Sequence, residues 1–353
     1  MRIGITVDPY YPVPPLQYGG IERIVDFVAR GLAARGHTIT MFAHPNSKIV
    51  GELIGYGVPP HQGRIIRMCE LAQLGGALLR RHRQFDVLLS WGRLAALVPV
   101  LPFRHLPKIQ RYCRDAVPWR SVTIASRLAR DSIRFVGSSE SVYMERSNNV
   151  PLSGNWQTIY DGVEVEKYLL VPEVPIDAPL AFLGRLDLMK GVHTAIAVAK
   201  KANRRLIIAG NKIENEAGLR YFRQEIEPYI DDNQIKYVGP VNDKQKNELL
   251  GHCAALLFPT LYKEGFGIVM AEAMACGVPV LGHPCGSVKE VVRQGVTGYV
   301  CANVAEYVEA VREVHKLNRS SIRKECEKRF SATNIVNQFE RLCLDMVEAS
   351  NRI

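Results

Sequence analysis

Two glutamates, Glu264 and Glu272, stand eight positions apart in the segment EGFGIVMAEAMACGVPV, whose other residues are apolar or small. The pattern predicts a helix that begins near Gly267 or Ile268 and ends at Gly277. Glu264 then lies in the loop before the helix, and Glu272 lies about one turn inside it. Helical side chains lean toward the N-terminus, so both carboxylates are expected near the same end of this helix.

The start of this helix suits an anion, because the first backbone N–H groups of a helix have no partner within it. Carboxylates around an anion site fit a ligand with hydroxyl groups at its ends and phosphates between them, such as a nucleotide sugar. The alternative is that Glu264 only interacts with the helix dipole and that Glu272 is an exposed helical glutamate. Gly265 and Gly267 favour the ligand, because glycines let the backbone approach it closely.

Arg185 and Lys190 are two cations five positions apart in the stretch GRLDLMKG, after an expected strand and before an expected helix. Gly184 and Gly191 flank them and place both on a tight loop at the carboxyl edge of a sheet. Fixed cations there can neutralise a departing diphosphate without donating a proton. In isolation, the pair is equally consistent with two solvated surface charges.

A glycine pair, Gly19 and Gly20, follows the first expected strand and opens an expected helix over residues 21–35. The N-terminus of such a helix can approach phosphates. A glycine pair is also common in a simple loop, and both interpretations stay open at this point.

Short apolar segments alternate with helical patterns along both halves of the chain, as in parallel sheets covered by helices on both faces. We therefore expect two doubly wound α/β domains with their ligands in the loops after the strands. The expected strands are residues 2–7, 37–43, 86–91, 107–112 and 133–139 in the first half, and 178–184, 204–210, 234–240, 253–259 and 277–282 in the second.

The domain boundary is expected near residues 160–179, where three prolines and an acidic composition interrupt the alternation. We assign residues 1–165 to an N-terminal Rossmann-like domain and residues 166–330 to a C-terminal one. Residues 331–353 read as an amphipathic helix that packs back on the body of the protein, with the N-terminal domain as a candidate surface.

Positive charge is concentrated in the first half, where residues 1–165 hold 20 Lys and Arg against 12 Asp and Glu. The whole chain has a net charge of +10, and 18 of those 20 cations are arginine, which makes forked contacts with phosphate and carboxylate. The excess indicates attraction to an anionic membrane surface or an anionic substrate, or simply a basic solvated surface.

Residues 64–83 are the candidate for membrane contact, because cations at both ends flank Met68, Leu71, Leu74, Leu78 and Leu79. This composition is compatible with a helix in the membrane interface. It is equally compatible with an ordinary amphipathic helix that faces the core and has basic ends.

Eight cysteines are scattered without a close CxxC pair, which argues against structural zinc or a disulfide framework and for a reducing compartment. The first apolar run is too short for a signal-peptide core, and no stretch approaches the roughly 20 apolar residues of a membrane-spanning helix. We expect a cytoplasmic protein, peripheral at the inner face of the membrane if the basic half binds lipid.

Taken together, the motifs GGIER, GRLDLMKGV and the two acids that run into ACGVPVL make the chain resemble the retaining nucleotide-sugar glycosyltransferases of family 4. The resemblance covers nearly the whole chain and includes FVGSSESV (135–142), YDGVEVEKY (160–168) and GSVKEVVRQGVTGYV (286–300). It implies the GT-B fold, in which two Rossmann-like domains face a central cleft. It also implies sugar transfer from a UDP- or GDP-sugar to an acceptor hydroxyl, with surface polysaccharide or a lipid-linked glycan as the expected acceptor and with no metal or cofactor.

The same resemblance implies roles for individual residues. Arg185 and Lys190 would bind the donor diphosphate and stabilise it as the leaving group. Glu272 would bind the ribose hydroxyls, and Glu264, the third catalytic residue, would hydrogen-bond the transferred sugar without acting as a covalent nucleophile. The remaining donor-binding residues are those of the glycine-rich loops and of the loop near the base: Gly19, Gly20, Gly184, Gly210, Val238, Val241, Gly265, Phe266, Gly267 and Ile268.

Two positions depart from the family pattern. Many relatives carry a histidine after the strand that here reads KIQRY, and they often have Asn-Gly where this chain has Asp161–Gly162. In place of the histidine stands a stretch that supplies the acceptor-side candidates Tyr112, Arg114 and Asp115.

Other functions fit the sequence less completely. A glycoside hydrolase also uses two carboxylates, but it leaves Arg185, Lys190 and the glycine pair unexplained. Sugar-nucleotide epimerases, phosphorylases and glycosyltransferases of small molecules are alternatives, although a phosphorylase needs a cofactor-bearing lysine for which no candidate stands out. A basic nucleic-acid-binding protein would show an aromatic-interleaved signature or a recognition helix, and neither is visible.

Overall fold

The computed structural model describes residues 1–16, 19–57, 63–144 and 153–352. The chain divides into two compact units: unit 1 is Met1–Asp161 with Ala332–Ile353, and unit 2 is Gly162–Ser331. The expected boundaries were after residues 165 and 330. Of the glycine-rich loop expected after the first strand, Gln17 and Tyr18 lie outside the described residues.

Unit 1 is built on a seven-stranded sheet with the order β3-β2-β1-β4-β5-β6-β7, in which every pairing is parallel. The five strands expected here are confirmed, and the two edge strands β3 and β7 are additional. The strands are β1 (Arg2–Thr6), β2 (Thr38–Ala43), β3 (Glu52–Gly55), β4 (Val87–Ser90), β5 (Lys108–Tyr112), β6 (Ile133–Gly137) and β7 (Trp156–Thr158).

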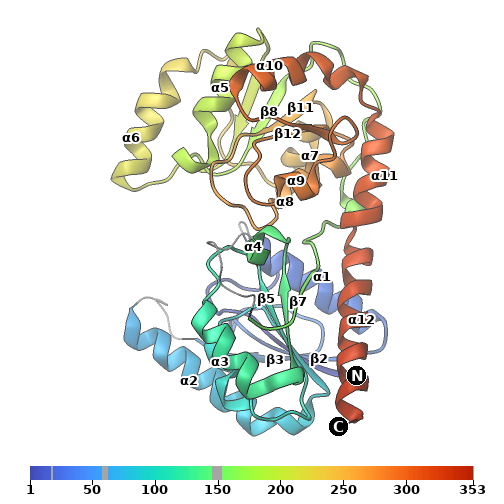
Figure 1. Ribbon diagram of the computed structural model, residues 1–353. Coiled ribbons are helices and arrows are strands. Elements are labelled where there is room, and N and C mark those ends of the chain that lie inside the picture. Colours follow the sequence, from blue (N-terminus) through green and yellow to red (C-terminus); the bar gives the residue numbers. More distant parts are fainter. Residues whose placement is uncertain (17–18, 58–62, 145–152, 353) are drawn as a thin grey trace. The chain divides into compact units, whose positions relative to one another are not determined.

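Helices cover both faces of this sheet (Figure 1). On one face, α1 (Gly20–Ala34) packs against the long C-terminal helix α12 (Ala332–Asn351), drawn in red. On the other face, α2 (Arg64–Arg81), α3 (Trp119–Ala129) and the 3-10 segment η2 (Leu94–Val100) share one apolar core with the strands. The short helix α4 (Ser141–Met144) follows β6.

Unit 2 is built on a six-stranded sheet with the order β10-β9-β8-β11-β12-β13, again with parallel pairings throughout. The five expected strands are confirmed, and the edge strand β13 is additional. The strands are β8 (Leu180–Leu183), β9 (Leu206–Ala209), β10 (Ile235–Tyr237), β11 (Ala255–Phe258), β12 (Val280–Gly282) and β13 (Gly298–Val300).

The helices of unit 2 form two groups: α10 packs on α5, and α11 packs on α8. Side chains of α5, α6 and α10 fill a core with the strands. The helices are α5 (Val192–Lys201), α6 (Glu216–Glu225), α7 (Asp243–Gly251), α8 (Ile268–Ala275), α9 (Val288–Val291), α10 (Val304–Glu313) and α11 (Arg319–Phe330).

Both sheets reverse their strand order beside their first strand, between β1 and β4 in unit 1 and between β8 and β11 in unit 2. The loops that leave the carboxyl ends of two such strands diverge, so a ligand can bind between them. The expectation of two doubly wound parallel sheets is confirmed, and the reversal points show where to look for a site.

Candidate functional site

The loop after β8 carries both predicted cations. The Arg185 guanidinium is half-exposed, and its Nη2 lies 3.3 Å from Oδ2 of Asp187. The other oxygen of Asp187 accepts a hydrogen bond of 2.9 Å from the backbone N–H of Lys190 and so caps this turn. Gly191 ends the turn with φ of 73°, and a Cβ there would overlap the carbonyl oxygen of Pro259. The loop is therefore tight and fixed against the segment after β11.

The loop after β11 carries Glu264, and Lys190 Nζ donates to its Oε1. The backbone of Glu264 is held as well, because its carbonyl accepts from Ser287 N at 3.1 Å. Since β8 and β11 are neighbours, the two loops meet at the reversal point of the sheet. The structure thus joins two residues that lie 74 positions apart and that the sequence placed in separate motifs.

Helix α8 begins at Ile268, as predicted, with Gly267 as its N-cap in the left-handed region (φ 75°) and with no capping side chain from the described part of the chain. Phe266, just before it, is buried against Phe330, with ring centroids 5.2 Å apart. The Phe266 carbonyl accepts from Ser287 Oγ at 2.8 Å. The Phe266 ring therefore points into the core, and a ligand at this position would meet its backbone.

Glu272 is 7% exposed, so the alternative of an exposed helical glutamate is wrong. Its Oε1 accepts hydrogen bonds from Tyr168 Oη at 2.8 Å and from Lys246 Nζ at 2.5 Å. Neither partner was predicted from the sequence. Tyr168 ends the motif 160–168 that supports the resemblance, whereas Lys246 lies in α7, DKQKNELLG, whose charges read as a solvated face.

Gly184 and Gly210 follow β8 and β9 and lie in close backbone contact. Gly210 has φ of 145°, and a Cβ on it would overlap the carbonyl oxygen of Gly184. Val238, 40% exposed, follows β10, and Val241 is half-buried just beyond it. All four predicted residues lie at the carboxyl edge of the unit 2 sheet.

In unit 1, Gly19 and Gly20 begin α1, as predicted, with Gly19 as the N-cap. The first turn also contains Glu22, which the sequence analysis did not single out and which is 9% exposed. Burial raises the pKa of the Glu22 carboxyl, nearby Arg114 lowers it, and Asp8 raises it further.

A second group of charged side chains, not predicted from the sequence, lies at the β1–β4 reversal of unit 1. Arg93 lies 3.7 Å from the carboxylate of Asp8 and 3.8 Å from that of Glu70. Its guanidinium also lies over the Tyr10 ring, 5.2 Å from the centroid. Burial raises the pKa of Asp8, and Arg93 opposes that rise. These residues come from loops and from α2, so no short spacing in the sequence could group them.

The three acceptor-side candidates lie in different surroundings. The Tyr112 ring packs near Phe135 and Trp156, with centroids 6.5 and 5.6 Å away. Its hydroxyl is buried and has no hydrogen-bond partner among the described residues. Arg114 and Asp115 are exposed. Tyr112 therefore belongs to the aromatic core of unit 1, whereas the other two side chains can meet a ligand.

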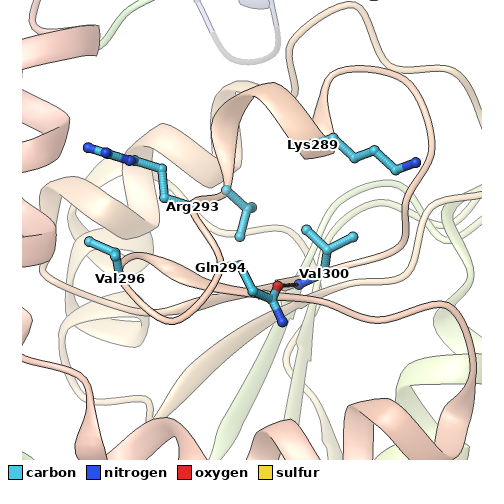
Figure 2. A pocket seen from close by; sticks show the side chains of 6 residues that line it. Lys289, Arg293, Gln294, Val296 and Val300 are labelled. Atoms are coloured by element: carbon cyan, nitrogen blue, oxygen red, sulfur yellow. Dashed lines mark hydrogen bonds between the residues drawn. The ribbon is translucent and has the colours of Figure 1, made fainter.

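A hollow of about 600 Å³ lies beside β13 in unit 2 (Figure 2). Gln294 closes its floor by accepting a hydrogen bond of 2.8 Å from the Val300 backbone. It contains none of the predicted site residues and no carboxylate, so it does not compete with the β8–β11 site. It is lined by Lys289, Val292, Arg293, Gln294, Val296 and Val300.

Comparison with known proteins finds a match for the part of the chain that holds the β8–β11 site. Residues 177–331 match the family model described as glycosyl transferases group 1. This match covers most of unit 2 and ends with it at Ser331. The matched region includes Arg185, Lys190, Lys246, Glu264 and Glu272, while Tyr168 lies just before it.

Curated relatives extend the similarity beyond residues 177–331. A glycogen synthase of Mycobacterium tuberculosis is 26% identical over 351 residues, which covers 85% of this chain and 83% of that protein. An O-antigen chain mannosyltransferase C of Escherichia coli is 22% identical and covers 99% of this chain and 100% of its own length.

Solved structures show the same fold over nearly the whole chain. A sucrose-phosphate synthase from Thermosynechococcus elongatus superimposes with a TM-score of 0.76 at 18% identity, covering 99% of this chain and 100% of that one. An Anabaena protein in complex with UDP and glucose gives 0.70 at 18% identity, with coverage of 97% and 99%. The expected GT-B fold, with two Rossmann-like domains, is confirmed.

No helix in the described ranges is both long and apolar enough to cross a membrane.

Proposed function

We propose that this chain is a retaining, metal-independent glycosyltransferase that moves a sugar from a UDP- or GDP-sugar to a hydroxyl of an acceptor. One observation carries the proposal. Within the region that matches the group 1 glycosyl transferases, a cation–carboxylate pair, Lys190 and Glu264, lies at the reversal point of the sheet, and the same loop leads into the helix that holds Glu272.

The donor would replace the ion pair between Lys190 and Glu264. Its diphosphate binds the Lys190 ammonium and the half-exposed Arg185 guanidinium. The Glu264 carboxylate, released from Lys190, then accepts hydrogen bonds from the sugar hydroxyls. Glu272 accepts from the ribose hydroxyls, and the backbone around Gly267 lies against sugar and phosphate. Gly19 and Gly20 remain predicted phosphate-binding residues of unit 1.

In the proposed reaction, the acceptor oxygen bonds to the anomeric carbon while the bond from that carbon to the diphosphate oxygen breaks. The acceptor oxygen bonds on the face of the sugar from which the diphosphate leaves, so the anomeric configuration is retained, and its proton passes to the leaving phosphate. Arg185 and Lys190 stabilise the charge that develops on the diphosphate, which is the work a metal ion does in other enzymes. Glu264 forms no covalent bond.

Two relatives support a glycan acceptor, because their names are glycogen synthase and O-antigen chain mannosyltransferase. We therefore propose a surface polysaccharide or a lipid-linked glycan intermediate as the acceptor. Arg114 and Asp115, both exposed at the end of β5, are the residues of the predicted set that can contact it.

A panel of UDP-, GDP- and ADP-sugars tests the function. We expect one of them to raise the melting temperature, and nucleoside diphosphate to be released only when a glycan acceptor is added, with the α or β configuration of the donor kept in the product. EDTA should leave the rate unchanged. Conversion of the donor without acceptor would indicate an epimerase, and phosphate-dependent cleavage of the glycan would indicate a phosphorylase; either result would replace the proposal.

We also propose that the protein lies in the cytoplasm and binds an anionic membrane surface through the first turns of α2. Leu74 and Leu78 are buried, so the C-terminal half of α2 faces the core. In the N-terminal half, Ile65 and Met68 are 78% and 69% exposed. Exposed Arg64 and other cations accompany them. An apolar surface between cations suits anionic headgroups above acyl chains.

Sedimentation with vesicles tests this surface. The protein should sediment with phosphatidylglycerol vesicles at low salt, and less so as the salt concentration rises. Met68→Ser together with Arg64→Gln should abolish the binding, while the exposed Arg120→Gln on α3 should have little effect. If both variants bind the vesicles as well as the wild type does, or if the wild type does not bind them at low salt, the proposed membrane binding is wrong.

A further inference from the structure

Two hydrogen bonds from described residues reach Glu272, and both end on the same carboxylate oxygen. Tyr168 Oη donates to Oε1 at 2.8 Å, and Lys246 Nζ donates to the same atom at 2.5 Å. The side chains of Glu272 and Lys246 are 10% and 12% exposed. We infer that Tyr168 and Lys246 are positioning residues for the donor nucleotide: they hold Oε1 so that Oε2 presents a fixed acceptor to the ribose hydroxyls. The inference rests on the proposed function and deepens it.

Tyr168 can position Glu272 because its own backbone is tied to unit 2. Asn247 in α7 accepts from Leu169 N at 3.1 Å and donates to the Lys167 carbonyl at 2.7 Å. From α11, Arg323 Nη1 donates to the Tyr168 carbonyl at 2.8 Å. The residues on both sides of Tyr168 are therefore anchored, although they precede the first strand of the domain.

Lys246 lies next to Asn247 in the same helix, so α7 supplies both an anchor for the tyrosine and a charge for the glutamate. The Lys246 ammonium also lies 5.8 Å from the centre of the Tyr168 ring and 3.2 Å from Asp243 Oδ1. A buried carboxylate needs a compensating charge. Lysine supplies it as a point charge, while the tyrosine hydroxyl fixes the direction of the carboxylate.

A carboxylate that is oriented before the ligand arrives loses less conformational freedom on binding. The ligand this arrangement fits is the ribose of a nucleoside diphosphate, whose hydroxyls donate hydrogen bonds. A merely structural role for Tyr168 and Lys246 would make no distinction between nucleotides with and without these hydroxyls.

Calorimetry with Tyr168→Phe tests the inference. We expect the nucleoside diphosphate that binds the wild type to bind this variant about tenfold more weakly, the factor that corresponds to about 1.4 kcal/mol. The 2′,3′-dideoxy analogue and inorganic pyrophosphate should bind both proteins equally. In a Glu272→Gln background, the tyrosine substitution should cause no further loss.

Lys246→Met should weaken binding of the same nucleotide at least as much. Two control substitutions at exposed side chains should not weaken it: Lys244→Met on α7, and Tyr229→Phe shortly after α6. If Lys246→Met fails to fold, the conservative Tyr168→Phe still decides the question. Unchanged affinity in Tyr168→Phe, or equal weakening of the dideoxy analogue, would overturn the inference alone. A folded wild type that binds no nucleoside diphosphate would overturn the proposed function and the inference with it.

Discussion

At the scale of single residues, Glu264 and Glu272 differ more than their shared segment suggests. Glu264 pairs with Lys190 from the neighbouring loop, whereas Glu272 is held inside the domain by Lys246 and Tyr168. The first pair can exchange its partners for a ligand. Glu272 keeps its partners on Oε1, and its Oε2 can accept hydrogen bonds from a ligand.

The Lys190–Glu264 pair leads to a prediction about catalysis. Lys190→Met removes a cation from the leaving group, so we expect kcat to fall by about 10² to 10³, as when one donor to a developing anion is lost. Steady-state kinetics would measure this, with Lys289→Met, an exposed cation on α9, as the matched control. A kcat within twofold of the wild type would contradict the proposed role.

Lys108 in unit 1 predicts a pH dependence of stability. Its ammonium group is buried and, within the described ranges, donates to the carbonyls of Leu101 and Phe103 and to the Ser132 hydroxyl, and burial lowers its pKa to about 7. Between pH 7 and the usual value of 10.5, the unfolded chain binds the proton and the folded chain does not. Raising the pH across this window therefore favours the folded state.

Urea unfolding of the wild type and of Lys108→Met at pH 7 and pH 9 would check this. All three tryptophans, Trp91, Trp119 and Trp156, lie in unit 1, so their fluorescence reports its unfolding. From pH 7 to pH 9, the free energy of unfolding of the wild type should rise by about 2 kcal/mol relative to that of the variant. Parallel behaviour of the two proteins would show that Lys108 keeps its charge when folded.

At the scale of elements, the strands that the sequence missed share one property. β3, β7 and β13 all lie at the edge of a sheet, and their burial patterns lack the continuous burial of the central strands. A central strand of a parallel sheet is covered on both faces and therefore shows an apolar run, which an edge strand does not need. The apolar pattern of the sequence therefore predicts the central strands of each sheet better than the edge strands.

The turns that carry the site predict a ranking of glycine substitutions. Gly191→Ala and Gly295→Ala both place a side chain at φ near +70°, but the Gly295 Cβ would meet nothing within 4 Å. The Gly191 Cβ would overlap the backbone of Pro259, which cannot rotate away. We expect losses of about 1 kcal/mol for Gly295→Ala and at least about 3 kcal/mol for Gly191→Ala.

Chemical unfolding followed by circular dichroism would measure these losses, and nucleotide binding should weaken in Gly191→Ala only. Equal stability of the two variants would mean that the loop before α5 is not fixed against the segment after β11.

At the scale of the whole molecule, the C-terminal helix belongs to unit 1 although unit 2 precedes it in the chain. Glu340 on α12 accepts from Arg35 at 2.7 Å and lies 2.9 Å from His37 Nε2, at the end of α1. Phe339 is fully buried, 5.2 Å from the Trp91 ring centroid. The first and last parts of the chain thus build one core.

Phe339→Ala should therefore destabilise unit 1 by about 3 to 5 kcal/mol, the usual cost of such a cavity. Tryptophan fluorescence would follow unit 1, and hydrogen exchange would follow the strands of unit 2, which should keep their protection. The half-exposed Leu344→Ala on the same helix is the control. Loss of protection in unit 2 alone would contradict the assignment of α12.

The sequence by itself determined the alternation of strands and helices, the start and end of α8, and the residue types that a sugar nucleotide needs, because local periodicity and capping depend on neighbours along the chain. Which of these residues meet was decided only by the tertiary structure. Lys190 meets Glu264 because β8 and β11 are adjacent, and Lys246 meets Glu272 because a side chain of α7 reaches α8. Both contacts depend on packing between segments that are distant in the chain, so no short spacing in the sequence predicts them.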